Sequence, residues 1–353
     1  MNAYMKAGQP VLSGLPRDEL IQMLAPLPRY RAIQVFKWIG GGSQTFDEMR
    51  NLPLTLRAEL SGRFRVRSSA VSVRADGRDG TVKLGIRLED GITIEAVLLR
   101  DKKNRKTACL STQAGCPANC VFCKTGAMGF LRNLSSAEIV EQLLLLREIG
   151  GEISNVVIMG MGEPLLNLGE LRRALSVICD PQGMGLSKRR VTVSTCGISA
   201  GIIDLADKGP AVRLALSLTA ADESLRMRLM PISRGQKLGD VKNALAYFQK
   251  SGGGRITLEA VLLGGINTSA KDAQALADFS QGLDAVVNLI PWNSFENPPA
   301  FSPALREPSR AETVDFKKQL ESLGMKVTCR LRRGSGVSGA CGQLGGAGTT
   351  SIN

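Results

Sequence analysis

Residues 190–218 read RVTVSTCGISAGIIDLADKGPAVRLALSL, and their pattern indicates the fold of most of the chain. The segments 190–194 and 212–218 are short and apolar, which is typical of buried strands. The segment 198–208 between them has apolar residues at helical spacing. A helix that connects two buried strands predicts a parallel sheet with helical crossovers.

The same alternation of strands and helices continues on both sides of this unit. Strands are predicted at 106–111, 155–159, 190–194, 212–218, 255–263, 285–290 and 326–331. Helices are predicted at 136–149, 168–178, 198–208, 222–229, 238–250, 270–281 and 308–323. About six such units predict an α/β barrel, incomplete or full, with catalytic residues at the carboxyl ends of its strands.

Different patterns precede and follow this α/β core. Residues 15–60 have apolar positions at helical spacing, and three glycines at 40–42 end one helical run. Residues 66–100 alternate between apolar and polar positions and contain Asp-Gly turns at 76–77 and 90–91, which predict antiparallel hairpins. The small residues near the C-terminus predict a mobile loop. The predicted domains are a helical domain at 1–62, a small antiparallel β extension at 63–104, a barrel core at 105–333 and a Gly-rich tail at 334–353.

The chain is strongly basic and contains no histidine. Its 353 residues are 43% hydrophobic and include 45 Lys and Arg against 32 Asp and Glu, for a net charge of +13. This excess favours a polyanionic partner such as RNA or DNA, although a basic surface without such a partner is an alternative. No apolar stretch approaches the roughly 20 residues that span a bilayer, and residues 1–10 show no signal-peptide core. We therefore expect a cytoplasmic protein without a membrane partner.

Three of the eight cysteines lie close together in the segment GCPANCVFC at 115–123. Four thiolates normally hold a 4Fe–4S cluster, so three thiolates leave one iron open. We interpret Cys116, Cys120 and Cys123 as the ligands of such a cluster. Its open iron would bind the amino and carboxylate groups of S-adenosylmethionine (SAM), and its electron would cleave the sulfonium to release a 5′-deoxyadenosyl radical.

A zinc site or a ferredoxin-like site with a fourth ligand elsewhere is the alternative to this interpretation. Zinc motifs more often pair cysteines two by two, and a ferredoxin segment usually supplies a fourth nearby cysteine. The absence of histidine also excludes an imidazole ligand and Ser-His or Cys-His catalysis. These points favour the radical SAM interpretation.

The segment MGMGEP at 159–164 ends the strand that follows the cysteine loop. Its glycines expose backbone, and Glu163 could pair with the ammonium group of SAM. Alone, Gly-Glu-Pro is a weak signal that also fits a turn. Its place one strand after the cysteines makes it a candidate SAM site.

Short motifs along the chain resemble those of a known family. They are YRAIQVFKWI (30–39), ACLSTQAGC (108–116), TG (125–126), GF (129–130), MGMGEPLLN (159–167), VTVSTCG (191–197), LALSL (214–218), LMPI (229–232), LIPWN (289–293) and ACGQL (340–344). Together these motifs resemble the RlmN/Cfr family of radical SAM enzymes, which methylate an aromatic carbon of adenine in RNA. The resemblance extends over nearly the whole chain.

The resemblance implies a radical-SAM partial (β/α)6 barrel that holds one 4Fe–4S cluster. It also implies two SAM molecules per turnover, one as methyl donor and one as radical source. The RlmN-like substrate would be C2 of adenine in 23S rRNA (adenine-2503), with tRNA (adenine-37) as a further substrate. A flavodoxin or ferredoxin would be the reductant, and the protein would be a monomer. The N-terminal helices and the β extension would contact the RNA, because RNA of complex shape needs an extended positive surface.

The resemblance also assigns the site residues. Cys341 matches the cysteine that takes a methyl group from SAM. The radical then removes a hydrogen atom from this methyl group, and the resulting carbon radical adds to adenine. Cys109 matches the cysteine that resolves this adduct through a disulfide with Cys341. Glu95 lies where the family has a carboxylate proposed as a proton acceptor. The matching SAM contacts are Gly162, Glu163, Ser194, Ser217, Leu218, Thr219 and Asn293.

Without the resemblance, these residues have plainer interpretations. Cys109 would be a buried strand cysteine, Cys341 a thiol of the tail and Glu95 a solvent-facing residue of a strand. Three further cysteines match no catalytic position and are expected to pack against the core: Cys179, Cys196 and Cys329.

The chain departs from the family at three places. Thr219 stands where a histidine usually follows Ser-Leu, Lys124 stands where alanine is common, and residues 334–339 lack the usual acidic residues. Two other functions stay open, namely C8 methylation of the same adenine and RNA binding by an iron–sulfur protein without catalysis. The retained Pro-Leu-Leu-Asn at 164–167 favours the C2 branch.

Overall fold

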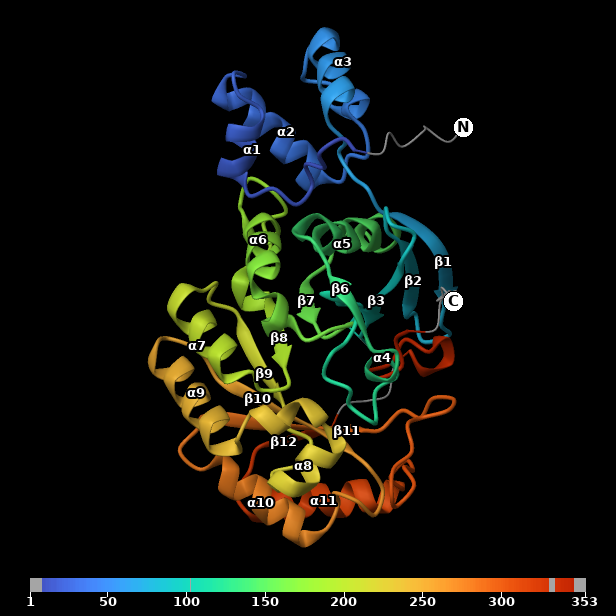
Figure 1. The fold of residues 1–353 in the computed structure, drawn as a ribbon, viewed down its shortest axis with the longest axis vertical. Coiled ribbons are helices and arrows are strands. Elements are labelled where there is room, and N and C mark those ends of the chain that lie inside the picture. Colours follow the sequence, from blue (N-terminus) through green and yellow to red (C-terminus); the bar gives the residue numbers. More distant parts are fainter. Residues whose placement is uncertain (1–7, 102, 330–333, 346–353) are drawn as a thin grey trace.

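The computed structural model describes residues 8–101, 103–329 and 334–345 of the chain. Figure 1 shows an elongated molecule in which helices α1 to α3 form one end, and a large sheet with its flanking helices forms the rest. Within the described ranges, no helix combines the length and the apolar composition that a membrane span requires.

The N-terminal end is helical, which confirms the prediction from its apolar spacing. Helix α2 ends at the glycine triplet, where Gly42 adopts a left-handed φ of 109° that a residue with a side chain would disfavour. Val35, Phe36 and Ile39 of α2 are buried in the core of this end. The elements are α1 (Arg17–Met23), α2 (Arg29–Gly41), the short 3-10 helix η1 (Phe46–Glu48) and α3 (Leu54–Arg63).

One ten-stranded sheet runs through the molecule in the order β1-β2-β3-β4-β7-β8-β9-β10-β11-β12. Its first four strands are antiparallel: β1 (Ala70–Asp76), β2 (Val82–Arg87), β3 (Thr93–Arg100) and β4 (Lys106–Cys109). The predicted turns connect the first three, because the Gly77 N–H donates to Thr81 O at 2.7 Å and Gly91 adopts a φ of 86°. The expected antiparallel hairpins are therefore confirmed.

From β4 onward, the strands of this ten-stranded sheet are parallel and alternate with helices, as predicted. The strands after β4 are β7 (Asn155–Ile158), β8 (Val191–Thr195), β9 (Arg213–Ser217), β10 (Ile256–Leu262), β11 (Ala285–Pro291) and β12 (Val327–Cys329). The helices are α5 (Ser136–Gly150), α6 (Leu168–Cys179), α7 (Ser199–Lys208), α8 (Glu223–Leu229), α9 (Leu238–Lys250), α10 (Ala270–Ser280) and α11 (Arg310–Ser322). Among the described residues β12 pairs with β11 alone, so the barrel is incomplete.

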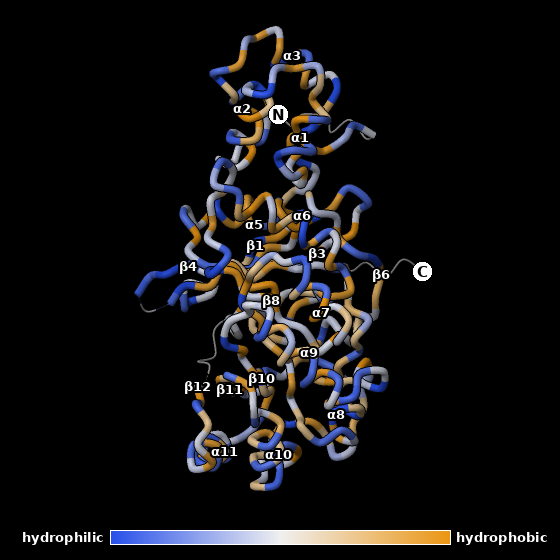
Figure 2. Tube along the Cα trace, turned by 90° about the vertical axis from the view of Figure 1, so that its left-hand side faces the viewer, coloured by the Kyte–Doolittle hydropathy of each residue, from blue (hydrophilic) through white to orange (hydrophobic). Residues whose placement is uncertain are grey.

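Helix α5 lies between the N-terminal helices and the sheet (Figure 1), and it is hydrophobic along much of its length (Figure 2). Its Glu141 is fully buried. The carboxylate accepts hydrogen bonds from Ser13 Oγ at 2.7 Å and from the main-chain N–H groups of Ser68 and Ser69 at 3.0 and 2.7 Å. These bonds tie the segments that flank the N-terminal helices to the barrel.

Short elements near the cysteine loop were not predicted. β5 (Gln113–Gly115) and β6 (Phe130–Asn133) form a two-stranded ribbon, with α4 (Lys124–Ala127) between them in sequence. Segments of three or four residues carry too little periodicity to be recognised. The short 3-10 helices of the barrel are η2 (Pro164–Asn167), η3 (Lys188–Arg190) and η4 (Pro231–Gly235).

The tail from 334 to 345 is folded against the barrel, so the predicted mobile loop is wrong for this segment. The segment includes the short helix η5 (Ser335–Val337). The Lys124 N–H donates to Gly342 O at 2.7 Å, and Thr125 Oγ1 donates to Leu344 O at 2.8 Å. The small residues permit close packing, since a Cβ at Gly342 would lie 3.2 Å from the main-chain oxygen of Phe122.

Candidate active site

Cys116, Cys120 and Cys123 lie on the loop between β5 and α4 and line one cavity of about 160 Å³. Tertiary hydrogen bonds hold this loop in place. Trp292 Nε1, just after β11, donates to the main-chain oxygen of Phe122 at 2.8 Å, and the Cys116 N–H donates to Gly129 O at 2.8 Å. The structure therefore brings the three predicted ligands together around a common space.

The donor set fits a 4Fe–4S cluster. Burial raises the pKa of the Cys116 thiol to about 12 and also raises the pKa values of Cys120 and Cys123. Such thiols keep their protons unless bound metal replaces them. Among the described residues, no three His, Cys, Asp or Glu side chains are grouped as ligands of a single metal ion. In a cluster each thiolate binds a different iron, so three thiols around a cavity suit a cluster better than one zinc ion.

Five of the predicted SAM contacts line the same cavity: Gly162, Glu163, Ser194, Ser217 and Asn293. Gly162 adopts a φ of 105°, and a Cβ there would lie 2.6 Å from Gln113 Cβ, so glycine is required. The Glu163 carboxylate accepts the N–H groups of Cys196 at 2.7 Å and Leu165 at 3.0 Å. Burial raises the pKa of Glu163, and these hydrogen bonds act in the opposite direction.

Glu259, which no sequence motif predicted, is a buried carboxylate on the cavity wall. Ser194 Oγ donates to Glu259 Oε2 at 3.1 Å and lies 3.3 Å from Ser217 Oγ. The three side chains come from neighbouring parallel strands, β8, β9 and β10, whose carboxyl ends meet here. The available signal was a glutamate inside the apolar strand ITLEAVL.

Leu218 and Thr219, the other two predicted SAM contacts, do not line this cavity. Both are buried, and Thr219 Oγ1 has no hydrogen-bond partner. Their main-chain N–H groups donate to Glu259 O at 2.9 and 3.1 Å. The structure thus connects these two residues to the cavity through the backbone of β10.

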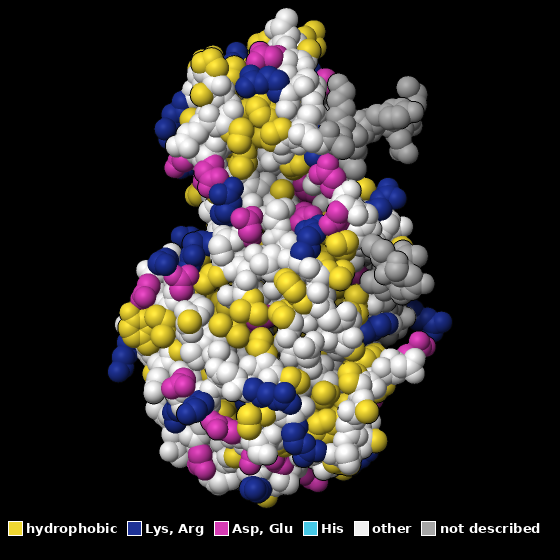
Figure 3. Space-filling view, in the orientation of Figure 1, with side chains coloured by type: hydrophobic (Ala, Val, Ile, Leu, Met, Phe, Trp, Pro, Cys, Tyr) yellow, Lys and Arg dark blue, Asp and Glu magenta, His cyan; other side chains and the backbone are white. Residues whose placement is uncertain are grey.

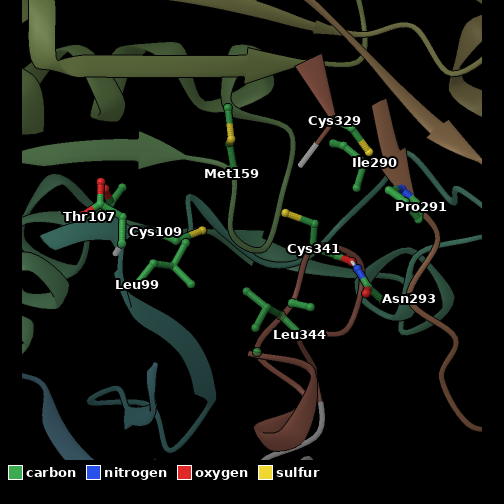
Figure 4. Close-up of a pocket in the computed structure, with 13 residues that line it drawn as sticks. Leu99, Thr107, Cys109, Met159, Ile290, Pro291, Asn293, Cys329, Cys341 and Leu344 are labelled. Carbon is green, nitrogen blue, oxygen red and sulfur yellow. Dashed lines mark hydrogen bonds between the residues drawn. The ribbon is translucent and has the colours of Figure 1, made fainter. Parts of the chain in front are cut away.

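A second cavity of about 370 Å³ adjoins the first and is lined by Cys109 and Cys341. Figure 4 shows the side chains of these two cysteines pointing toward one another, with Met159 nearby. Cys109 ends β4, and Cys341 lies on the folded tail. Among the described residues, no disulfide joins these two cysteines. Four residues line both cavities: Met159, Ile290, Asn293 and Cys341.

Glu95 is buried on β3, so its interpretation as a solvent-facing residue is wrong. Its carboxylate pairs with Lys83 Nζ at 3.0 Å and accepts the N–H of Gly345 at 2.6 Å. Glu95 lines neither of the two cavities. It instead contacts the tail four residues beyond Cys341.

The three remaining cysteines have different environments. Cys179 packs against the main core, and Cys196 is buried beside the cysteine loop, so the packing prediction is confirmed for both. Cys196 also lines the first cavity. Cys329 is exposed and lines the second cavity, so the packing prediction is wrong for this residue. The reason is that β12 lies at the edge of the sheet.

The fold and the cysteine loop define the class of radical SAM enzymes, and comparisons with known proteins agree. The family model of the radical SAM superfamily matches residues 110–278. A radical SAM methyltransferase from Sphaerobacter thermophilus, known from its crystal structure, superposes with a TM-score of 0.89 at 38% identity. The match covers 95% of this chain and 99% of that chain.

Relatives of known name identify the family. A probable dual-specificity RNA methyltransferase RlmN from Treponema pallidum is 47% identical over 95% of this chain and 97% of its own length. A protein of the same name from Thermus thermophilus is 40% identical over 97% of this chain and 94% of its own length. The chain belongs to the RlmN/Cfr family of radical SAM RNA methyltransferases, and it is an enzyme of this type. The resemblance inferred from the motifs is confirmed.

Proposed function

We propose that this enzyme methylates C2 of adenine in 23S rRNA, and adenine in tRNA as well, through a methylated Cys341. The relatives named as dual-specificity RNA methyltransferases support two kinds of RNA substrate. The observation that carries the proposal is the position of Cys341, which lines both the cavity of the cluster cysteines and the cavity of Cys109. A cysteine that carries the methyl group has to be accessible from both cavities.

Bound at Cys116, Cys120 and Cys123, a 4Fe–4S cluster supplies the electron that cleaves the sulfonium of SAM. The sulfur of Cys341 would first attack the methyl carbon of one SAM molecule, so that a new S–C bond forms as the methyl–sulfonium bond breaks, S-adenosylhomocysteine leaves and the thiol proton passes to solvent. After a second SAM supplies the radical, the thioether methyl of Cys341 would give up a hydrogen atom, and its carbon would bond to C2 of adenine. The radical adduct would then return one electron to the oxidised cluster and give the C2 proton to Glu95. Cys109 then attacks the sulfur of Cys341, so that an S–S bond forms as the S–C bond breaks, and the released carbon takes a proton to become the methyl group.

The residues that line the first cavity support the proposed SAM contacts. We assign the ammonium group of SAM to Glu163, whose carboxylate is held by two main-chain N–H groups. The exposed backbone of Gly162 and the side chains of Ser194, Ser217 and Asn293 form the remaining wall. Leu218 and Thr219 act indirectly, because their N–H groups position β10 and thereby Glu259.

Glu95 is the proposed proton acceptor for the adenine adduct. Its contact with Gly345 places it beside the tail that carries Cys341. Because its carboxylate is paired with Lys83, accepting a proton would require this ion pair to loosen. Glu95 would therefore become available when both its ion pair with Lys83 and its hydrogen bond from the Gly345 N–H open.

We assign RNA contacts to the helical domain at 1–62 and the β extension at 63–104. On the face shown in Figure 3, Lys and Arg side chains are spread over the helical end and the barrel, interspersed with acidic ones, so no single patch defines the footprint. The barrel at 105–333 and the tail at 334–353 carry the chemistry. The protein acts as a cytoplasmic monomer that accepts electrons from a flavodoxin or ferredoxin.

Two measurements test this function. Mass spectrometry of purified enzyme should find a methyl group on Cys341, and its absence would favour RNA binding without catalysis. Mass mapping of rRNA from a deletion strain should show loss of 2-methyladenine at one position. Loss of 8-methyladenine instead would assign the enzyme to the C8 branch.

A further inference from the structure

Arg226 of α8 is a fully buried arginine beside the cysteine loop. Its side chain is 1% exposed, and its guanidinium donates to the main-chain oxygens of Cys196 at 2.5 Å, Ser217 at 3.1 Å and Leu218. These oxygens lie at the carboxyl ends of β8 and β9. Its Nη1 also donates to Met230 Sδ at 3.6 Å, and its Nε is buried without a hydrogen-bond partner.

The charge of Arg226 has no acidic partner among residues 8–101, 103–329 and 334–345. Lys83, by contrast, is a buried cation with an acidic partner, because the Glu95 carboxylate lies 3.0 Å from its Nζ. Arginine does not lose its proton in proteins, so burial leaves a full positive charge that three carbonyl dipoles offset only in part. A buried charge of this kind is costly unless an anion lies close to it.

The surroundings of Arg226 indicate where that anion binds. The Val121 N–H of the cysteine loop donates to the main-chain oxygen of Leu229, on the same helix, at 3.0 Å. Burial lowers the pKa of Arg226, whereas the nearby thiols of Cys196 and Cys120 raise it. Arg226 also donates to the main-chain oxygen of Cys196, and Cys196 lines the same cavity as Cys120. These contacts place the charge of Arg226 beside the cysteine loop.

We propose that Arg226 is a positioning residue whose buried positive charge stabilises the reduced state of the iron–sulfur cluster. This inference rests on the proposed cluster site at Cys116, Cys120 and Cys123. One electron from a low-potential donor adds one negative charge to the cluster, and no proton needs to move. A fixed cation in a low-dielectric environment favours the more negative state, so Arg226 raises the reduction potential.

The test compares three variants of the anaerobically reconstituted full-length enzyme at matched iron and sulfide content. Arg226→Gln removes the charge but keeps an amide donor for the carbonyls, and Arg226→Lys keeps the charge. Arg228→Gln is the matched control, because Arg228 is an exposed arginine on the same helix. The readout is the midpoint potential of the cluster, followed by EPR during a reductive titration.

Arg226→Gln should lower the ratio of reduced to oxidised cluster at a fixed potential by about tenfold, which is about 59 mV for a one-electron couple. The midpoint potentials of Arg226→Lys and Arg228→Gln should stay close to that of the parent enzyme. Equal potentials in Arg226→Gln and the parent would overturn the inference. If Arg226→Gln loses its cluster, retention by Arg226→Lys supports the role of charge, and loss from both variants overturns it. A parent enzyme without any SAM-responsive cluster signal would instead refute the proposed function.

Discussion

Asn293 Nδ2, just beyond β11, donates a hydrogen bond of 3.2 Å to the main-chain oxygen of Cys341 on the tail. The other end of the same amide, Oδ1, is buried without a partner. Asn293 therefore holds the tail with one group and presents an unsatisfied acceptor in the cavity shared with Cys341. An acceptor in this state is costly unless a ligand or water donates to it. Asn293 thus tethers the tail at the wall of the two cavities that both residues line.

Loss of this contact should expose Cys341. In the apoprotein, Asn293→Ala should increase the rate at which iodoacetamide alkylates Cys341 several-fold, because the tail loses one of its tethers. Peptide mass spectrometry measures the rate for this cysteine alone. Asn288→Ala, on β11 and bonded to Thr328, should leave the rate unchanged. Equal rates in the two variants would show that Asn293 does not hold the tail.

Removing one cluster ligand should separate chemistry from folding. Cys120→Ala should abolish the brown chromophore and methylation, because two thiolates cannot hold the cluster. The far-ultraviolet circular dichroism spectrum should be unchanged, since alanine fits the buried position of the cysteine. Cys179→Ala, at a packing position, should retain colour and turnover. Turnover by Cys120→Ala would contradict the assignment of the ligand.

The proposed resolving role of Cys109 predicts a trapped intermediate. Cys109→Ala should accumulate a covalent adduct between the enzyme and RNA, because no thiol is left to attack the sulfur of Cys341. Denaturing gel electrophoresis with labelled RNA detects this adduct. The double variant Cys109→Ala/Cys341→Ala should show none. Free methylated RNA at the normal rate from Cys109→Ala would exclude the role.

Glu312 on α11 should make the stability of the apoprotein depend on pH. The hydrogen bond from Arg306 lowers the pKa of Glu312 from 4.5 to about 2, so its ionised form stabilises the fold above about pH 4.5 and this contribution is lost as the pH falls toward 2. Glu312→Gln should lower Tm by about 1–3 °C at pH 7. The difference in Tm between Glu312→Gln and the parent protein should become smaller as the pH drops below 4.5. Glu321→Gln, near the end of the same helix, is the control, and a pH-independent difference for Glu312→Gln would refute the linkage.

Much of the fold could be predicted because its signals are local. The predicted strand at 190–194 and helix at 198–208 agree with β8 and α7 to within one residue at each end. The spacing of apolar residues indicates which face of a helix or strand is buried, and this spacing can be read from residues that are close together in the sequence. The cysteine loop could be recognised for the same reason, since its three thiols lie within eight residues, 116–123.

Contacts between distant residues could not be predicted in this way. Glu259 and Arg226 look like single polar residues within apolar or basic segments, and their roles depend on what the neighbouring strands bring to them. The Gly-rich tail has the composition of a mobile loop, yet it is bonded to Thr125 across a separation of 219 residues. Composition indicates the conformation that a segment favours in isolation. In the folded protein, hydrogen bonds and packing contacts with distant segments outweigh this conformational preference.

The amino-acid order was sufficient to indicate an α/β barrel, three candidate cluster ligands and a basic protein, because periodicity, spacing and charge are properties of the chain alone. The meeting of Cys341 with Asn293, the burial of Glu95 and the unpaired charge of Arg226 came from folding. Those features require segments from different strands to share one desolvated space, where hydrogen bonds and charges act far more strongly than they do in water.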